Sequence, residues 1–409
     1  MQLFSSKTEK QRDHRGRREF LRHGLVGMGV LATGSMLSHC RESNPVGAKG
    51  EPPSRTLGDR LGKLGPLQPP DENGVRLPEG FTSRVVAQSS QEPVPGCGYR
   101  WHPAPDGAAV FTTDDGWIYV SNSEVGGNQG GVGALRFDLE GRVIDSYSIL
   151  DGTSTNCAGG PTPWGTWLSC EEFDQGQVWE CDPLGKKQAI VRPALGLFKH
   201  EAAAVDPVRN DVYLTEDTGD GLFYRFRPGN SAPDLSAGRL EAAEVMDGGK
   251  VAWHRVKDPS GAVQPTRMQV PQATAFRGGE GIWQHDQVIY FTTTQDGRVW
   301  AYDISASTIT VIYDDDDHAE PELTGVDNIT VSAAGDVIVA EDGGDQQIVT
   351  VLPGRKTAAL LRVVGHDKSE ITGPVFDPSG TRLYFSSQRG ATGESEDGMT
   401  FEVTGPFLA

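Results

Sequence analysis

Short hydrophobic runs recur along the chain, and each ends in small hydroxyl or acidic residues. Six segments share this pattern: GWIYVSNSE (116–124), GTWLSCEE (165–172), DVYLTED (211–217), QVIYFTTTQ (287–295), GDVIVAED (335–342) and TRLYFSSQR (381–389). Their central residues are 48, 46, 77, 48 and 46 residues apart, namely Tyr119, Trp167, Tyr213, Tyr290, Ile338 and Tyr384. Aromatic and β-branched runs bounded by glycine and aspartate turns predict strands. A repeat of this length with several strands per unit is typical of propeller blades.

A second hydrophobic run follows each of these segments and predicts a third strand per unit. The runs are GALRFD (133–138), GQVWECD (176–182), GLFYRF (221–226), GRVWAYD (297–303), QQIVTVL (346–352) and MTFEVT (399–404). The sequence therefore predicts an all-β, six-bladed β-propeller, with an insertion around residues 228–262 in the one long gap. Helical pattern is scarce, and GRLEAAEVM (238–246) is one weak helix candidate within that insertion. A pair of β-sandwiches is the alternative, which the even spacing disfavours.

The first 40 residues differ from the rest, because a basic stretch precedes the apolar run GLVGMGVLATGSML (24–37). Adjacent Arg17 and Arg18, followed by Phe20 and Leu21, resemble a twin-arginine export signal. We expect a signal peptide over 1–40, a linker over 41–75 and the propeller over 76–409. The predicted location is then periplasmic or secreted, with the twin-arginine export machinery as a partner. A basic tail on a cytosolic protein is the alternative, and lipid anchoring at Cys40 is disfavoured because a histidine precedes it.

The chain is strongly acidic, with a formal net charge of −19. That balance excludes nucleic acid as a binding partner, since binding to it needs a basic face. It is compatible with clustered carboxylates that hold cations. The protein is expected to be a monomer. Besides Cys40 there are four cysteines, which could form disulfides or stay reduced if the chain folds before export: Cys97, Cys157, Cys170 and Cys181.

Propeller geometry places the start of each first strand beside the end of each second strand, at one mouth of the central channel. The ends of the second strands carry Glu124, Glu171 with Glu172, Glu216 with Asp217, Gln295, Glu341 with Asp342, and Gln388 with Arg389. The starts of the first strands carry Asn156 with Cys157, His200 with Glu201, Glu280, Asp327 with Asn328, and Glu370, while the first blade offers Arg100 and His102 at a wider spacing. We expect these polar residues to converge.

Carboxylates crowded in a partly buried space repel one another, and bound cations relieve that repulsion. Oxygen ligands suit calcium, whereas a thiolate among carboxylates suits iron or zinc. The alternative is that acids at strand ends are solvated turn residues, which is what we expect for Asp314 to Asp317. Cys170 and Cys181 are expected to be packing residues or a disulfide rather than ligands. Repetition at one register in four blades, together with Cys157 at a channel end, favours a metal site.

Four stretches together resemble the PhoX-type alkaline phosphatases: NCAGGPTPWGTWLSCEE, FKHEAAAVDP followed by VYLTED, EGIWQHDQVIYFTT, and GVDNITVSAAGDVIVAEDG. The resemblance implies an exported six-bladed propeller that hydrolyses phosphate esters at iron and calcium ions, with a cysteine thiolate on iron. The metal ligands that the resemblance implies are Cys157, Glu124, one or both of Glu171 and Glu172, Glu201, Glu216, Glu280 and Glu341. Three further residues fall in matching motifs, namely Asn156, Asp327 and Asn328.

The chain is a short, divergent member by this resemblance. Ser123 stands where the family often has histidine, and SSQRG (386–390) replaces a usual Gln-His-Pro-Gly. Arg389 is a catalytic candidate, because a guanidinium there could bind a phosphate oxygen, although it could equally be a surface residue. Two other hypotheses remain open, namely a different propeller hydrolase such as a calcium-dependent lactonase, and a non-catalytic, calcium-stabilised binding module.

Overall fold

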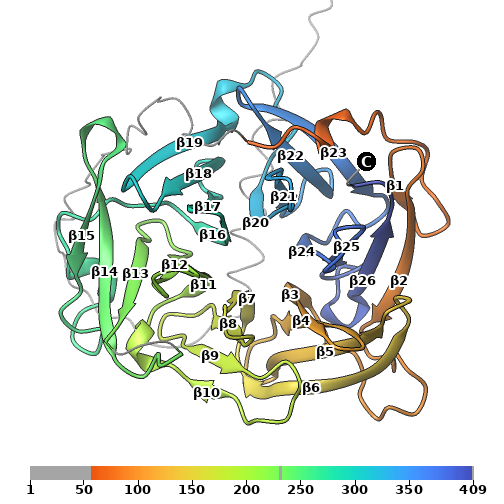
Figure 1. Ribbon diagram of the computed structural model, residues 1–409, viewed down its shortest axis with the longest axis horizontal. Coiled ribbons are helices and arrows are strands. Elements are labelled where there is room, and N and C mark those ends of the chain that lie inside the picture. The colour runs from red at the N-terminus through yellow and green to blue at the C-terminus, as the bar shows by residue number, and fades with distance from the viewer. Residues whose placement is uncertain (1–56, 230–232, 408–409) are drawn as a thin grey trace, which may run out of the picture. The chain divides into compact units, whose positions relative to one another are not determined.

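The computed structural model describes residues 57–229 and 233–407, which form six antiparallel sheets arranged as blades around a central channel (Figure 1). This arrangement confirms the predicted all-β, six-bladed propeller. The predicted signal peptide and Cys40 lie outside the described residues, as do residues 230–232 of the predicted insertion.

The innermost strand of each blade lines the channel, and the others follow outward in chain order, except that two blades take their outermost strand from the N-terminal part of the described chain. Blade I is β3 (Pro105–Thr113), β4 (Gly116–Ser123), β5 (Gly130–Asp138) and β6 (Val143–Thr153). Blade II is β7 (Asn156–Pro161), β8 (Trp167–Glu171), β9 (Val178–Cys181) and β10 (Ile190–Val191). Blade III is β11 (His200–Val205), β12 (Val212–Glu216), β13 (Phe223–Pro228), β14 (Gly238–Val245) and β15 (Val251–Arg255).

The remaining blades include the strands that close the ring. Blade IV is β16 (Gly279–His285), β17 (Val288–Thr293), β18 (Arg298–Asp303) and β19 (Thr308–Asp314). Blade V is β20 (Val326–Val331), β21 (Val337–Glu341), β22 (Gln347–Leu352), β23 (Lys356–Val363) and β1 (Val75–Arg76). Blade VI is β24 (Ile371–Phe376), β25 (Arg382–Ser387), β26 (Met399–Thr404) and β2 (Thr82–Gln88).

Residues near the N-terminal end of the described chain close the ring. Strand β2 is the outer strand of blade VI and pairs antiparallel with β26, so a single blade combines the two ends of the propeller sequence. Part of the predicted linker also belongs to the propeller, because Leu57 and Leu61 are buried and the Leu61 amide donates to Asp336 Oδ1 at 3.2 Å. The ordered contacts therefore begin earlier than residue 76.

Hydrophobic side chains fill the spaces between neighbouring blades. Six buried clusters lie one at each blade interface, and the predicted central residues of the second strands are all buried. Tyr119 of blade I and Tyr384 of blade VI, for example, have ring centroids 5.3 Å apart. Burial of each such side chain contributes about 1.5–3 kcal/mol. A blade buries both faces only against its neighbours, which is why the ring must close.

The insertion extends blade III, and its weak helix candidate is a strand. Residues Gly238–Val245 form β14, whose Ala242 pairs with Tyr224 of β13. The helix prediction was wrong because the exposed edge of β13 offers backbone hydrogen bonds that outweigh local helix propensity. Among the described residues the only helices are short 3-10 turns, and none could span a membrane.

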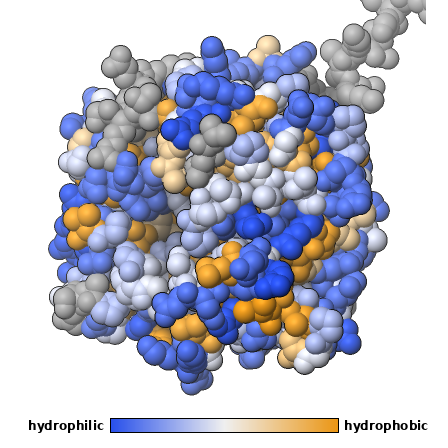
Figure 2. Space-filling model, turned by 45° about the vertical axis from the view of Figure 1, so that its right-hand side comes forward, coloured by the Kyte–Doolittle hydropathy of each residue, from blue (hydrophilic) through white to orange (hydrophobic). Residues whose placement is uncertain are grey.

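The four described cysteines are all free thiols. On the face shown in Figure 2, hydrophilic side chains dominate and hydrophobic ones form small, separate patches.

Candidate metal centre at the channel mouth

Each innermost strand has an irregularity in its pairing close to its first residue. The register shifts occur between Pro105 and Ala108, Asn156 and Gly159, His200 and Ala203, Gly279 and Ile282, Val326 and Ile329, and Thr372 and Val375. Such bulges redirect a side chain out of the normal alternation. In five blades the residue within the bulge is polar and buried, namely Asp106, Cys157, Glu201, Glu280 and Asp327. The repeated bulge thus gathers a thiol and four carboxyl groups at the mouth.

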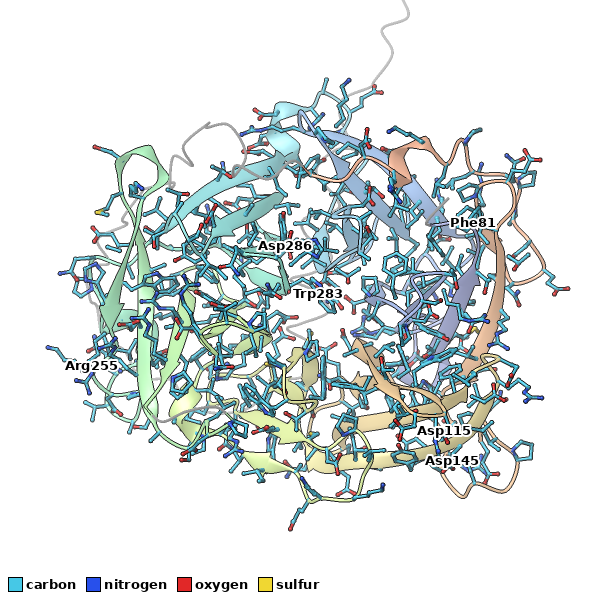
Figure 3. The ribbon with its side chains drawn as sticks, viewed as in Figure 1. Phe81, Asp115, Asp145, Arg255, Trp283 and Asp286 are labelled. Carbon is cyan, nitrogen blue, oxygen red and sulfur yellow. The ribbon has the colours of Figure 1, made fainter. Side chains whose placement is uncertain are left out.

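Small residues next to this polar layer let the inner strands approach closely. Gly107, Ala158, Ala202, Gly281 and Gly373 line the channel. A Cβ atom on Gly107 would lie only 2.4 Å from Cα of Ala158, so only glycine fits. Further along β16, Trp283 borders the channel, whereas Arg255 on β15 lies at the outer edge (Figure 3). Close backbone approach is what brings the polar side chains of different blades together.

The paired acids at the ends of the second strands divide between two roles. The first acid of each pair accepts a hydrogen bond from a backbone amide at or just before the start of the third strand, at 3.2 Å in each case: Glu171 from Gln177, Glu216 from Leu222, and Glu341 from Gln347. These three predicted ligands therefore hold loops and are not brought into the cluster. The second acid of each pair takes part in the interactions of the mouth, namely Glu172, Asp217 and Asp342.

Burial raises the pKa of both Glu216 and Glu341 to about 7, although their hydrogen bonds lower it in part. The two predicted asparagines also serve the scaffold. Asn156 donates to Ser169 Oγ at 2.9 Å and accepts from Thr153, so its amide is engaged within blade II and the preceding loop. Asn328 accepts from the Gly373 amide at 2.7 Å and donates to Asp327 Oδ1 at 3.0 Å, which orients that carboxylate.

Three groups of potential ligand atoms converge at the mouth. In each group the atoms lie within 4.8 Å of one another; the groups are Glu124, Cys157 and Glu172; Glu201, Glu280 and Asp327; and Asp327, Asp342 and Glu370. Asp327 is shared by the last two, and Cys157 Sγ lies 3.0 Å from Glu201 Oε1, which links the first two. The acids Asp314 to Asp316 form a further group on an outer strand and its loop, remote in the fold from these inner strands.

Asp106 belongs to the cluster although the sequence analysis did not select it. Its Oδ2 lies 3.7 Å from Cys157 Sγ and accepts a short hydrogen bond from Gln388 Nε2. Asp106 precedes Tyr119 by 13 residues, whereas the separation between the site residue and the central residue of the second strand is 10 to 12 for Cys157, Glu201, Glu280 and Asp327. A count of residues that allowed for the bulge and for the longer hairpin of blade I would have selected Asp106. Arg100 and His102 were the residues considered for that blade. Arg100 instead donates to the carbonyl oxygen of Ser90, and the ring nitrogens of His102 hydrogen-bond with Tyr99 and Ser121.

Polar partners from neighbouring blades brace the acids. Arg389 pairs with Glu370 and places Nη2 3.5 Å from Glu124 Oε2. Gln388 donates to the same Glu124 oxygen at 2.9 Å. Lys199, which the sequence analysis did not single out, lies 2.9 Å from Glu172 Oε1 and 2.8 Å from Asp217 Oδ2. A lysine next to two acids that are distant in sequence gives no signal until the blades are placed.

The electrostatics of the cluster favour a bound positive charge. Burial raises the pKa of Asp106 and Glu201 well above the ordinary range, and neighbouring acids raise it further. Burial and the adjacent Glu172 raise the pKa of Glu124 to about 8, and burial, Asp106 and Glu201 raise that of the Cys157 thiol. Among the described residues, Asp106 Oδ1 and Glu201 Oε2 are buried without a hydrogen-bond partner. A set of carboxylate oxygens with one thiol, in which two oxygens lack a hydrogen-bond partner, suits the binding of metal ions.

The fold and the site together define a propeller with a carboxylate and thiol cluster at its channel mouth. The family model of alkaline phosphatase PhoX matches residues 121–311 of the chain. The match confirms the predicted resemblance to the PhoX-type alkaline phosphatases over this part of the chain. No curated protein matches the chain in sequence.

Solved structures share the fold at low sequence identity. PhoX from Pseudomonas fluorescens, in complex with vanadate, a transition state analogue, is 17% identical with a TM-score of 0.66, over 86% of this chain and 98% of that chain. A gluconolactonase from Xanthomonas campestris is 12% identical with a TM-score of 0.50, over 84% of this chain and 98% of that chain. At these identities the likeness establishes a common propeller fold and not a common reaction.

Proposed function

We propose that this protein hydrolyses phosphate esters at metal ions held by the acids and the thiol of the channel mouth. The observation that carries the proposal is the convergence of Cys157 with Glu124, Glu172 and Glu201 from three blades. The match to the alkaline phosphatase PhoX family supports the choice of phosphate esters among the substrates that such a site could take.

Iron and calcium are the metals that we propose. A thiolate favours a transition metal over calcium, so iron belongs with Cys157, Glu124 and Glu172. The groups made only of carboxylates, with Asp327 shared between them, suit calcium. When bound, such ions polarise phosphoryl oxygens and stabilise the charges of attacking and leaving oxygens.

The chain's own residues would orient the ligands and the substrate. Gln388 holds Asp106 and Glu124 in place through its amide group. Arg389 is our candidate for a direct substrate contact, because its guanidinium borders Glu124 and Glu370 and its side chain is 34% exposed. A guanidinium binds two phosphate oxygens at once, which would orient an ester for attack.

The predicted signal sequence supports a periplasmic or secreted enzyme, exported folded through the twin-arginine machinery. Folding and metal loading would then precede export, which agrees with the absence of disulfides among the described residues. We propose that the protein acts as a monomer on a small-molecule phosphate ester.

The test is turnover of aryl phosphate mono- and diesters by the metal-loaded protein, beside Cys157→Ala and Glu201→Gln variants. The proposal requires activity that both variants lose. Turnover no greater than that of the variants would refute it. A lactone panel run in parallel distinguishes the alternative hydrolase, since hydrolysis of lactones without phosphatase activity would assign the site to that reaction. Calcium without iron and without either activity would instead indicate a binding module.

A further inference from the structure

Two cations that are far apart in the sequence bracket the thiol-containing group. Arg389 bridges acids of blades VI and I, namely Glu370 and Glu124. Lys199 bridges acids of blades II and III, namely Glu172 and Asp217. Charges of opposite sign therefore alternate along this part of the rim. In the order Glu370, Arg389, Glu124, Glu172, Lys199 and Asp217, two acids follow one another only at Glu124 and Glu172. The Cys157 thiol lies within 4.8 Å of a carboxylate oxygen of each.

We infer that Lys199 is a second phosphate-binding residue, which acts with Arg389 on the opposite side of the Glu124, Cys157 and Glu172 group. This inference rests on the proposed function and extends it to the class of substrate. A phosphate monoester is a dianion near neutral pH, whereas a diester carries a single negative charge. Two cations that flank one anion site favour the dianion, so the enzyme prefers monoesters.

Exposure and position allow Lys199 to reach a substrate. Its side chain is 23% exposed, while its partners Glu172 and Asp217 are 5% and 1% exposed. Lys199 is therefore the most exposed of these three side chains. An ammonium on a flexible stem can change partners at little cost. A cation bound at Glu172 weakens the hold of that carboxylate on Lys199, which leaves the ammonium available to an incoming phosphate.

A purely structural role makes a different prediction. If Lys199 serves only to neutralise Glu172 and Asp217, its removal disturbs those acids and changes metal content or folding. If it binds phosphate, its removal weakens phosphate affinity while the metals remain. Phosphate affinity and metal content, measured on the same samples, separate the two roles.

The experiment uses Lys199→Gln, which removes the charge, and Lys199→Arg, which keeps it. Lys356→Gln is the matched control, because Lys356 is an exposed lysine at the start of the outer strand β23. Titration calorimetry of the metal-loaded proteins with inorganic phosphate gives the dissociation constant, elemental analysis gives the metal content, and kinetics compare an aryl phosphate monoester with the corresponding diester.

We expect Lys199→Gln to weaken phosphate binding about 10- to 100-fold at unchanged metal content, as for a lost charge-assisted hydrogen bond. Its kcat/KM should fall more for the monoester than for the diester, and Lys199→Arg should restore most of the affinity. Unchanged phosphate affinity in Lys199→Gln, a loss in proportion to metal, or wild-type protein that binds no phosphate would each overturn the inference. Phosphate binding that depends on Lys199 in a protein without esterase activity would instead refute the proposed function alone.

Discussion

The sulfur of Cys157 and a carboxylate oxygen of Glu201 lie 3.0 Å apart across the junction of blades II and III. Both residues occupy bulges at the starts of inner strands, and both are buried. Burial raises the pKa of each group, because it disfavours the thiolate and the carboxylate relative to their protonated forms. A metal ion that replaces those protons relieves the same electrostatic cost.

Replacement of Cys157 should remove the transition metal and little else. We expect Cys157→Ser to reduce the content of that metal at least about tenfold and to abolish thiolate-to-metal absorption, because no other described thiol belongs to the cluster. The free energy of unfolding without metal should change by only about 1 kcal/mol. Cys170→Ala is the control, since Cys170 is buried in the same blade on β8. Equal metal contents in the two variants would contradict the assignment.

Glu171 and Glu172 are adjacent in sequence but differ in role, since Glu171 accepts hydrogen bonds from loop amides and Glu172 belongs to a group of potential metal ligands. Glu171→Ala leaves the amides of Ser154 and Gln177 without their acceptor, so we expect a loss of about 2–3 kcal/mol in unfolding free energy with metal content unchanged. Glu172→Gln should lower metal content without that loss of stability. Denaturant unfolding and elemental analysis of both variants are the measurements. If Glu171→Ala were the variant that loses metal, the division of roles would be wrong.

The close approach of blades I and II should make Gly107 intolerant of a side chain. Gly107→Ala places a Cβ atom 2.4 Å from Cα of Ala158, and the backbone shift should cost about 1–3 kcal/mol in unfolding free energy and lower metal affinity. Gly126→Ala is the matched control, since its nearest neighbour would be 3.9 Å away. Comparable stabilities in the two variants would show that the inner strands are not tightly packed there.

The stability of the metal-free protein should fall as the pH rises from about 5 to about 8. The pKa values of Glu216 and Glu341 are raised to about 7, and that of Glu124 to about 8. A carboxyl with a higher pKa in the folded state contributes stability that is complete at low pH and is lost as the pH rises through that pKa. Unfolding in urea with chelator, measured at four pH values, tests this. Stability that increases over the same range would contradict it.

The repeat alone was sufficient to predict the six blades, because strand and turn patterns are local. The mouth was predicted only in part. Cys157, Glu201, Glu280 and Asp327 could be assigned from their separation in sequence from the central residue of the next strand. The choice between Glu171 and Glu172 could not be made from the sequence, because it depends on which of the two side chains faces the third strand.

Side-chain contacts between different blades could not be predicted for a related reason. Gln388 contacts Asp106 across the junction where the first and last blades meet. Lys199 contacts Glu172 across another blade junction. These contacts depend on how neighbouring blades pack, which a linear pattern does not encode.

The central claim is that the channel mouth holds a mixed iron and calcium cluster. Elemental analysis of the purified protein, with Cys157→Ser prepared in parallel, tests it most directly. The account predicts iron and calcium in the wild type, with iron lost and calcium largely kept in the variant, because the all-carboxylate groups around Asp327 remain. Wild-type protein that contains neither metal after folding in the presence of both would contradict it.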